Sequence, residues 1–282
     1  MTEKSILDQH GASWRQWILD NLERNCNPIG MLERMTKSVW NTDQAKAAID
    51  QGLVELNKNL NWRKPIPSIP NSQLVALDQQ TIRVLGRFNQ PKAALLDAVL
   101  SQNECQKLIQ YATSKGLKSS GVVDGETGQS IQHQARTSST VFFTRAETPL
   151  IDRIEQRLAR LTNWPVSHGE GLQILRYQED QQYKPHFDWF DPNKPGSAKH
   201  LERGGQRVAT TIMYLAAPTL GGATTFPKTG IEVQPNVGGA MFFNDIDDLG
   251  VPDQLSLHAG APVIEGTKII MTYWQREQAF RK

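Results

Sequence analysis

Cysteine is scarce in this 282-residue chain. The two cysteines, Cys26 and Cys105, lie far apart in segments of different character. Two isolated thiols do not make a disulfide framework, and such scarcity fits a reducing compartment. A strong net charge is also missing, because 31 basic and 29 acidic residues leave a formal charge of only +2. We therefore expect neither nucleic acid nor an anionic membrane surface as a partner.

Long hydrophobic runs are absent as well. No window approaches the roughly 20 apolar residues that cross a bilayer, so we expect no membrane segment. Residues 1–17 lack a basic stretch followed by an apolar one, which predicts no signal peptide and a cytoplasmic protein. With 38% hydrophobic and 21% charged residues, the composition is typical of a globular protein with one sizeable core and a small appendage.

Residues 13–60 carry apolar side chains at helical spacing, in three successive stripes. We predict three short helices, the last capped by Asn41 or Thr42 and ended by Gly52. The tryptophans of this segment are expected in its core rather than on a binding surface. Three prolines follow within residues 61–72 and favour an extended linker. We therefore divide the chain into a helical segment with its linker, 1–72, and a second domain, 73–282.

The second domain shows two helices followed by strands. Ser101 and Glu104 form a capping box before one amphipathic helix, and Thr148-Pro149 begins another. From about residue 171 the apolar period changes to two. The predicted strands are 171–177, 207–215, 239–243 and 268–274. Helices before a run of strands predict an α+β, mainly β fold, either an antiparallel sandwich or a jelly roll with helices outside one sheet.

His186 and Asp188 stand two residues apart in YKPHFDWF, so on a strand both side chains leave the same face. The pair alone is weak evidence, since a strand-end histidine bonded to a nearby carboxylate gives the same pattern. His258, in SLHAGAPV, would supply the second imidazole of a facial triad that binds Fe(II) and leaves three positions open. The remaining histidines are expected near the surface rather than as ligands: His10, His133, His168 and His200.

Lys268 follows His258 by ten residues and begins the last predicted strand. Its side chain shares one face of that strand with Ile270, Thr272 and Trp274. A lysine that points into a barrel is unfavourable unless it meets an anion, and a dicarboxylic cosubstrate would provide one. The alternative is that this face lies outside and Lys268 is solvated. Periodicity alone leaves both possibilities open.

Ordered sequence blocks over about residues 90–280 resemble the prolyl 4-hydroxylase α-subunit family of Fe(II)/2-oxoglutarate dioxygenases, in its short bacterial form. The blocks are LSQNECQKLIQYA, RTSSTVFF, LQILRYQEDQQYKPHFDWF, RVATTIMYL with GGATTFP, and SLHAGAPV with the later GTK. The resemblance implies a double-stranded β-helix, or jelly roll, at about residues 170–276, with outer helices. It also implies that His186, Asp188 and His258 are catalytic iron ligands, and that Lys268 pairs with the distal carboxylate of 2-oxoglutarate.

Further roles follow from the same resemblance. Tyr177 and Thr224 correspond to positions that help hold 2-oxoglutarate. Tyr183, Arg207 and Trp274 correspond to positions lining the substrate side in members that hydroxylate peptides. For Arg207, a structural hydrogen bond at the start of a strand is an equal alternative.

The chain also departs from the family pattern. Many members have Lys-Trp where this chain has Lys268-Ile269, and the loop after Phe243, NDIDDLGVPDQ, is unusually acidic. These departures leave the cofactor residues intact and bear on the substrate.

The implied reaction is hydroxylation of an unactivated C–H bond, driven by oxidative decarboxylation of 2-oxoglutarate to succinate and CO₂. The resemblance favours a prolyl residue of a peptide or protein as substrate and ascorbate as reductant. A free amino acid or small biosynthetic intermediate is the first alternative, and a catalytically silent jelly-roll binding module is the second. Residues 13–60 could recruit a protein substrate or act as a stabilising or dimerising cap; we favour the cap, since exposed tryptophans promote aggregation.

Overall fold

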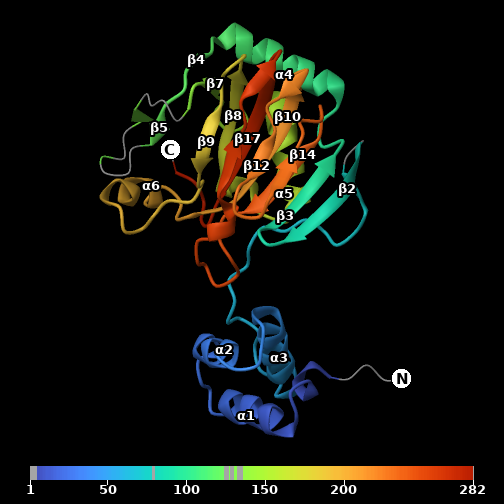
Figure 1. Ribbon diagram of the computed structural model, residues 1–282, viewed down its shortest axis with the longest axis vertical. Coiled ribbons are helices and arrows are strands. Elements are labelled where there is room, and N and C mark those ends of the chain that lie inside the picture. Colours follow the sequence, from blue (N-terminus) through green and yellow to red (C-terminus); the bar gives the residue numbers. More distant parts are fainter. Residues whose placement is uncertain (1–4, 78–79, 124–126, 128–129, 132–135, 282) are drawn as a thin grey trace. The chain divides into compact units, whose positions relative to one another are not determined.

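The computed structural model describes residues 5–281 apart from 78–79, 124–126, 128–129 and 132–135 (Figure 1). The chain forms two compact units, residues 1–65 and 66–282. Residues 66–72, which the sequence assigns to the linker, belong to the second unit. Ile69 is buried in its core, and the Ser68 amide donates to the Thr162 carbonyl at 2.8 Å. Within the described residues, no helix has the length and apolar character needed to cross a membrane.

The first unit contains the three predicted helices, α1 (Ala12–Glu23), α2 (Pro28–Thr36) and α3 (Thr42–Glu55). Of the two predicted caps, Asn41 is the one that caps α3, and it forms a capping box with Gln44. The prediction that Gly52 ends α3 is wrong, because the helix continues to Glu55. A Cβ on Gly52 would lie 2.7 Å from Leu22 Cδ1, so this glycine lets α3 pack closely against α1.

The tryptophans of the first unit differ in burial. Trp40 is 3% exposed, whereas Trp14 and Trp17 are half-buried. The rings of Trp14 and Trp17 meet edge to face with their centroids 5.3 Å apart, and Trp14 also contacts Trp40. The expectation that these residues are core therefore holds fully for Trp40 and partly for the other two.

Two antiparallel sheets build the second unit. The large sheet has the order β1-β2-β3-β14-β10-β17-β8-β7-β4, and the small sheet has the order β13-β12-β15-β9. The large-sheet strands are β1 (Leu74–Leu77), β2 (Gln80–Asn89), β3 (Lys92–Asp97), β14 (Ala240–Asn244), β10 (Arg207–Ala216), β17 (Lys268–Arg276), β8 (Gly169–Tyr177), β7 (Ser139–Phe142) and β4 (Lys118–Ser119). The small-sheet strands are β13 (Ile231–Val233), β12 (Thr224–Phe226), β15 (His258–Gly260) and β9 (Tyr183–His186). Two further sheets of two strands each pair β5 (Val122–Val123) with β6 (Ser130–Ile131), and β11 (Leu220–Gly221) with β16 (Val263–Glu265).

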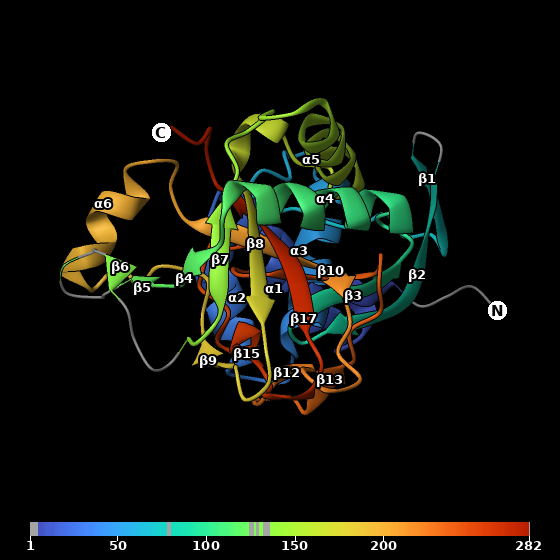
Figure 2. The ribbon, with the colours of Figure 1, turned by 90° about the horizontal axis from the view of Figure 1, so that it is seen from above.

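Helices cover one face of the large sheet, and the small sheet lies against the other (Figure 2). The covering helices are α4 (Gln102–Lys115), capped by Ser101, and α5 (Pro149–Leu161), capped by Thr148, as predicted. Strand β17 shows the period of two: Met271 and Tyr273 pack into the helix-side core, while Ile270 packs between the sheets. This is the predicted jelly roll with outer helices, and the four predicted strands correspond to β8, β10, β14 and β17.

Sequence reasoning missed the hairpin formed by β2 and β3, which precedes α4 and widens the large sheet. Strand β2 lies near the sheet edge, and its exposed residues alternate with buried or half-buried ones. Ile82, Val84 and Phe88 share the less exposed face, so the period of two is present in the sequence of this strand. The expected order of helices first and strands afterwards is therefore incomplete.

Candidate active site

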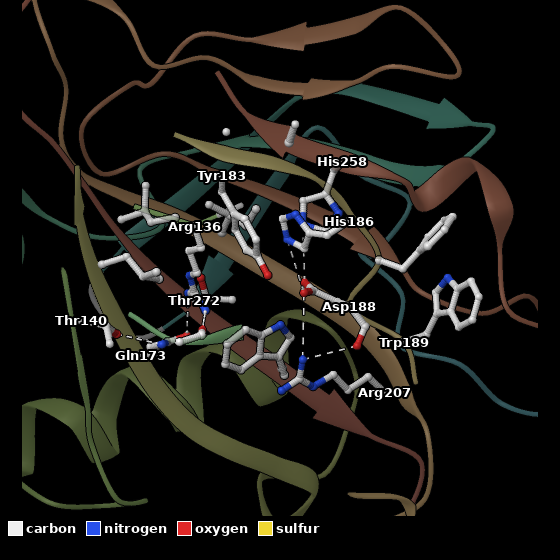
Figure 3. A pocket seen from close by; sticks show the side chains of 18 of the residues that line it. Arg136, Thr140, Gln173, Tyr183, His186, Asp188, Trp189, Arg207, His258 and Thr272 are labelled. Carbon is white, nitrogen blue, oxygen red and sulfur yellow. Dashed lines mark hydrogen bonds and ion pairs between the residues drawn. The ribbon is translucent and has the colours of Figure 1, made fainter. Parts of the chain in front are cut away.

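Strand pairing brings the two predicted histidine ligands together. In the antiparallel pair of β9 and β15, His258 lies directly opposite His186, and their ring centroids are 4.2 Å apart. Asp188 follows β9 by two residues. Its Oδ1 lies 3.8 Å from His186 Nε2, and its Oδ2 lies 3.6 Å from His258 Nε2. One ligand atom from each of the three residues lies within 4.8 Å of the other two (Figure 3).

Hydrogen bonds select the tautomer of both imidazoles. His186 Nδ1 lies 2.8 Å from the Lys184 carbonyl, and His258 Nδ1 lies 2.9 Å from the Ser256 carbonyl. A carbonyl only accepts, so both Nδ1 atoms carry hydrogen, and in the neutral imidazole this leaves Nε2 with a free lone pair facing Asp188. Burial lowers the pKa of His186 to about 3, which keeps this ring neutral at pH 7.

Asp188 provides the negative charge of the cluster. Burial alone would raise the pKa of this carboxyl, but the surrounding charges and hydrogen-bond donors, Arg207 and Trp274 among them, outweigh burial and lower the pKa to about 2. An ionised carboxylate and two imidazole lone pairs are a donor set suited to a divalent transition metal. Metal-binding histidines also commonly donate their other N–H to a carbonyl, as both do here.

A cavity of about 630 Å³ opens beside this cluster. It brings together the residues that the sequence proposes for the site: Tyr177, Tyr183, His186, Asp188, Arg207, Thr224, His258, Lys268 and Trp274. Ile270 and Thr272 also line it, which confirms that the face of β17 shared with Lys268 points inward.

Lys268 is only 2% exposed, so the alternative of a solvated lysine is wrong. It lies opposite Tyr177 on the neighbouring strand, and its Nζ is 5.7 Å from the Tyr177 ring centroid. Nearby, the Tyr214 hydroxyl donates to Thr224 Oγ1 at 3.0 Å. No carboxylate of the described residues pairs with Lys268, and burial lowers its pKa to about 8. A buried ammonium in this setting calls for an external anion.

The Arg207 guanidinium is already paired. Its Nε and Nη2 donate to the two oxygens of Glu170 at 2.6 and 3.0 Å, and its Nη1 donates to the Asp188 carbonyl at 3.3 Å. The group also lies over the Trp274 ring, 4.0 Å from the centroid. Of the two readings of Arg207, the structural hydrogen bond is the one that the geometry favours.

Tyr183 stacks on His186 with ring centroids 3.5 Å apart. The Arg136 guanidinium lies over the Tyr183 ring and donates to Gln173 Oε1 at 3.3 Å. Gln173 donates in turn to Thr140 Oγ1 at 2.7 Å. Sequence reasoning assigned no role to Arg136, Gln173 or Thr140. Gln173 could have been found, because it lies on the same face of β8 as Tyr177.

The other described histidines do not join the cluster. They are partly exposed, as expected of residues near the surface. His10 packs edge-on against Trp40, and His200 stacks on Phe190 with centroids 5.0 Å apart. His168 lies near the Arg276 carbonyl. His133 falls outside the described residues.

Comparison with known proteins decides the family. Residues 172–276 match the 2OG-Fe(II) oxygenase superfamily. Probable prolyl 4-hydroxylase 6 of Arabidopsis thaliana is 39% identical over 210 residues, which cover 68% of this chain and 71% of that protein. Prolyl 4-hydroxylase 2 of the same plant is 35% identical over 215 residues, covering 69% and 70%. The chain belongs to the prolyl 4-hydroxylase family of 2OG-Fe(II) oxygenases.

A solved structure supports the fold of this prolyl 4-hydroxylase family member. The viral collagen prolyl hydroxylase of Paramecium Bursaria Chlorella virus-1, in its 2OG complex, aligns with a TM-score of 0.52 and 30% identity. The alignment covers 65% of this chain and 94% of the viral protein. As a member of the family, the chain is a 2-oxoglutarate-dependent dioxygenase, and the family implies Fe(II), 2-oxoglutarate and O₂ as its requirements.

Proposed function

We propose that this dioxygenase hydroxylates a prolyl residue in a peptide or protein. The observation that carries the proposal is one cavity holding both a His-Asp-His cluster with free Nε2 lone pairs and a buried ammonium without a carboxylate partner among the described residues. The relatives named as prolyl 4-hydroxylases support the choice of substrate.

Each end of the cavity has a distinct role in this proposal. His186, Asp188 and His258 would hold Fe(II), and Lys268 would receive the distal carboxylate of 2-oxoglutarate. The iron and its cosubstrate, when bound, supply the oxidant that hydroxylates the C–H bond. The remaining contribution of the protein is to orient these groups and to keep water away from the reacting bond. Tyr177 and Thr224, both buried beside Lys268, would help position the same carboxylate.

Two observations favour a peptide over a free amino acid. The Arg207 guanidinium is bound in bidentate fashion by Glu170, so its fork is not free to receive a substrate carboxylate. In addition, Arg136 Nε and Trp189 Nε1 are buried donors on the cavity wall that have no acceptor among the described residues. Figure 3 shows these two side chains on either side of Asp188. Backbone carbonyls of an extended peptide would satisfy such separated donors, with Tyr183 and Trp274 lining the substrate side.

The remaining parts of the proposal rest on the resemblance and the composition alone. They are ascorbate as reductant, a cytoplasmic location, a homodimer, and an N-terminal helical segment that is separate from the catalytic domain. A free amino acid or small intermediate remains the alternative substrate class, and it would require Arg207 to leave Glu170.

The test is anaerobic binding of Fe(II) and 2-oxoglutarate, followed by exposure to O₂ and detection of succinate. We expect wild type to form succinate slowly alone and faster with a proline-rich peptide. His186→Ala should lose at least about 90% of succinate formation, because it removes one of the three proposed iron ligands. His10→Ala is the matched control and should behave as wild type. Stimulation by free proline but not by peptide would contradict the substrate assignment, and no succinate at all would contradict the reaction.

A further inference from the structure

A threonine hydroxyl lies between two buried carboxyl groups behind the proposed metal centre. Thr210 Oγ1 is 2.9 Å from Asp188 Oδ2 and 2.8 Å from Asp245 Oδ2. Thr210 and Asp245 are both 0% exposed. The arrangement follows from sheet order, because Thr210 lies on β10 opposite Phe243 of the neighbouring β14, and Asp245 directly follows β14. Three side chains from separate segments thus form one continuous hydrogen-bonded line.

The direction of the two hydrogen bonds follows from counting hydrogens. A hydroxyl has one hydrogen, so Thr210 can donate to only one of the two carboxyl groups and must accept from the other. A carboxyl group that ligates a metal is a carboxylate, which only accepts hydrogen bonds. Asp245 is fully buried, and its Oδ1 has no hydrogen-bond partner among the described residues. A buried charge in such a place is strongly disfavoured. Asp245 is therefore the donor to Thr210, and Thr210 is the donor to Asp188.

We propose that Asp245 is a positioning residue of the metal centre: its carboxyl group fixes the Thr210 hydroxyl, which in turn fixes the Asp188 carboxylate. The inference rests on the proposed function, since it takes Asp188 as a metal ligand. Groups that orient a ligating carboxylate typically change metal affinity or activity by 10- to 100-fold. Asp245 lies in the acidic segment after Phe243, where this chain departs from the family pattern. The line through Thr210 gives that departure a physical role.

The experiment measures the anaerobic Fe(II) dissociation constant of the full-length protein by titration, without 2-oxoglutarate or turnover. Asp245→Leu keeps the shape of the side chain and removes the donor, and we expect it to weaken Fe(II) binding about tenfold. Asp245→Asn keeps an N–H donor and should stay within about threefold of wild type. Thr210→Val should also weaken binding. The matched control is Thr211→Val on the same strand, because the Thr211 hydroxyl is equally buried and has no partner among the described residues; it should leave the dissociation constant unchanged.

A double-mutant cycle then tests whether Asp245 acts through Thr210. In a Thr210→Val background, Asp245→Leu should cause no further loss, since the line is already broken. The inference would be overturned if the two substitutions weakened Fe(II) binding additively, or if Asp245→Leu bound Fe(II) as tightly as wild type. In either case, Fe(II) binding by the wild type would leave the proposed function standing. A wild type that does not bind Fe(II) would overturn both. Thermal unfolding of the metal-free variants checks folding, and Asp245→Ala replaces Asp245→Leu if the larger side chain prevents it.

Discussion

At the scale of single residues, Lys268 determines how the cavity responds to pH. Its ammonium is buried, and burial lowers its pKa to about 8, well below the ordinary lysine value. Below pH 8 the side chain is charged and ready to pair with a carboxylate. Above pH 8 it is neutral in the ligand-free protein, so binding of a dianion must first take up a proton.

We therefore expect the affinity for 2-oxoglutarate to fall above about pH 8, by up to about tenfold per pH unit. The measurement is the dissociation constant of 2-oxoglutarate in the metal-loaded, anaerobic protein between pH 6.5 and 9.5. Lys268→Arg is the control, because arginine stays charged over this range, and its weaker binding should not change with pH. If the dissociation constant changed with pH to the same extent in both proteins, Lys268 would not be the group that pairs with 2-oxoglutarate.

Sequence reasoning reached some site residues and missed others for a physical reason. The spacing of His186 and Asp188 and the face of Lys268 are visible because a strand repeats every two residues. The line through Thr210 and Asp245 joins two strands that are neighbours in the sheet, and its members have no fixed spacing in the chain. Only the pairing of the strands shows that these side chains meet.

At the scale of secondary-structure elements, close packing explains where one helix prediction was wrong. Glycine commonly ends helices, and Gly52 was assigned that role. In the folded unit it is instead an interior residue of α3 that faces Ile18 and Leu22 of α1. The requirement for a small side chain arises from a contact between helices, which the local pattern of α3 does not contain.

Gly52→Ala should therefore destabilise the first unit although alanine is the better helix former. A Cβ would meet Leu22 Cδ1 at 2.7 Å and Ile18 Cγ2 at 3.2 Å, and overpacking of a core typically costs 1–3 kcal/mol. We expect a net loss of about 1 kcal/mol after the gain in helix propensity. Hydrogen exchange of α1 and α3 amides is the readout. Gly30→Ala in α2 is the control, since a Cβ there meets nothing within 4 Å. This substitution should slow hydrogen exchange, because alanine is the better helix former. Slower exchange in both variants would refute the packing argument.

At the scale of the whole molecule, the chain has two units with separate cores. Leu7, Ile18 and Met35 are among the buried residues of the first unit. The second unit has its own helix-side core and a core between its sheets, and the residues that line the cavity all belong to it. The jelly roll was predictable from strand periodicity together with the family resemblance. The boundary between the units was not predictable, because it falls inside the proline-rich segment 61–72. Only the contacts of this segment show which of its residues join the second unit.

Because each unit has its own core, we expect residues 66–282 to fold and to bind Fe(II) and 2-oxoglutarate within about threefold of the full chain. Succinate formation without substrate should be retained, and the KM for a peptide reports whether residues 1–65 recruit it. Circular dichroism and the same binding assays are the measurements. Aggregation of the shortened protein would contradict this expectation and support the stabilising cap that the sequence analysis favours.

Strand β17 supports two functions at once, one on each face. Lys268, Ile270, Thr272 and Trp274 face the cavity, while Met271 and Tyr273 face the helices. A single inserted or deleted residue would exchange the two faces and place the apolar pair in the cavity. Over evolutionary time, this strand can change by substitution but hardly by a shift in length. New substrate ranges in such a protein would arise from the loops around the cavity, where length is free to vary.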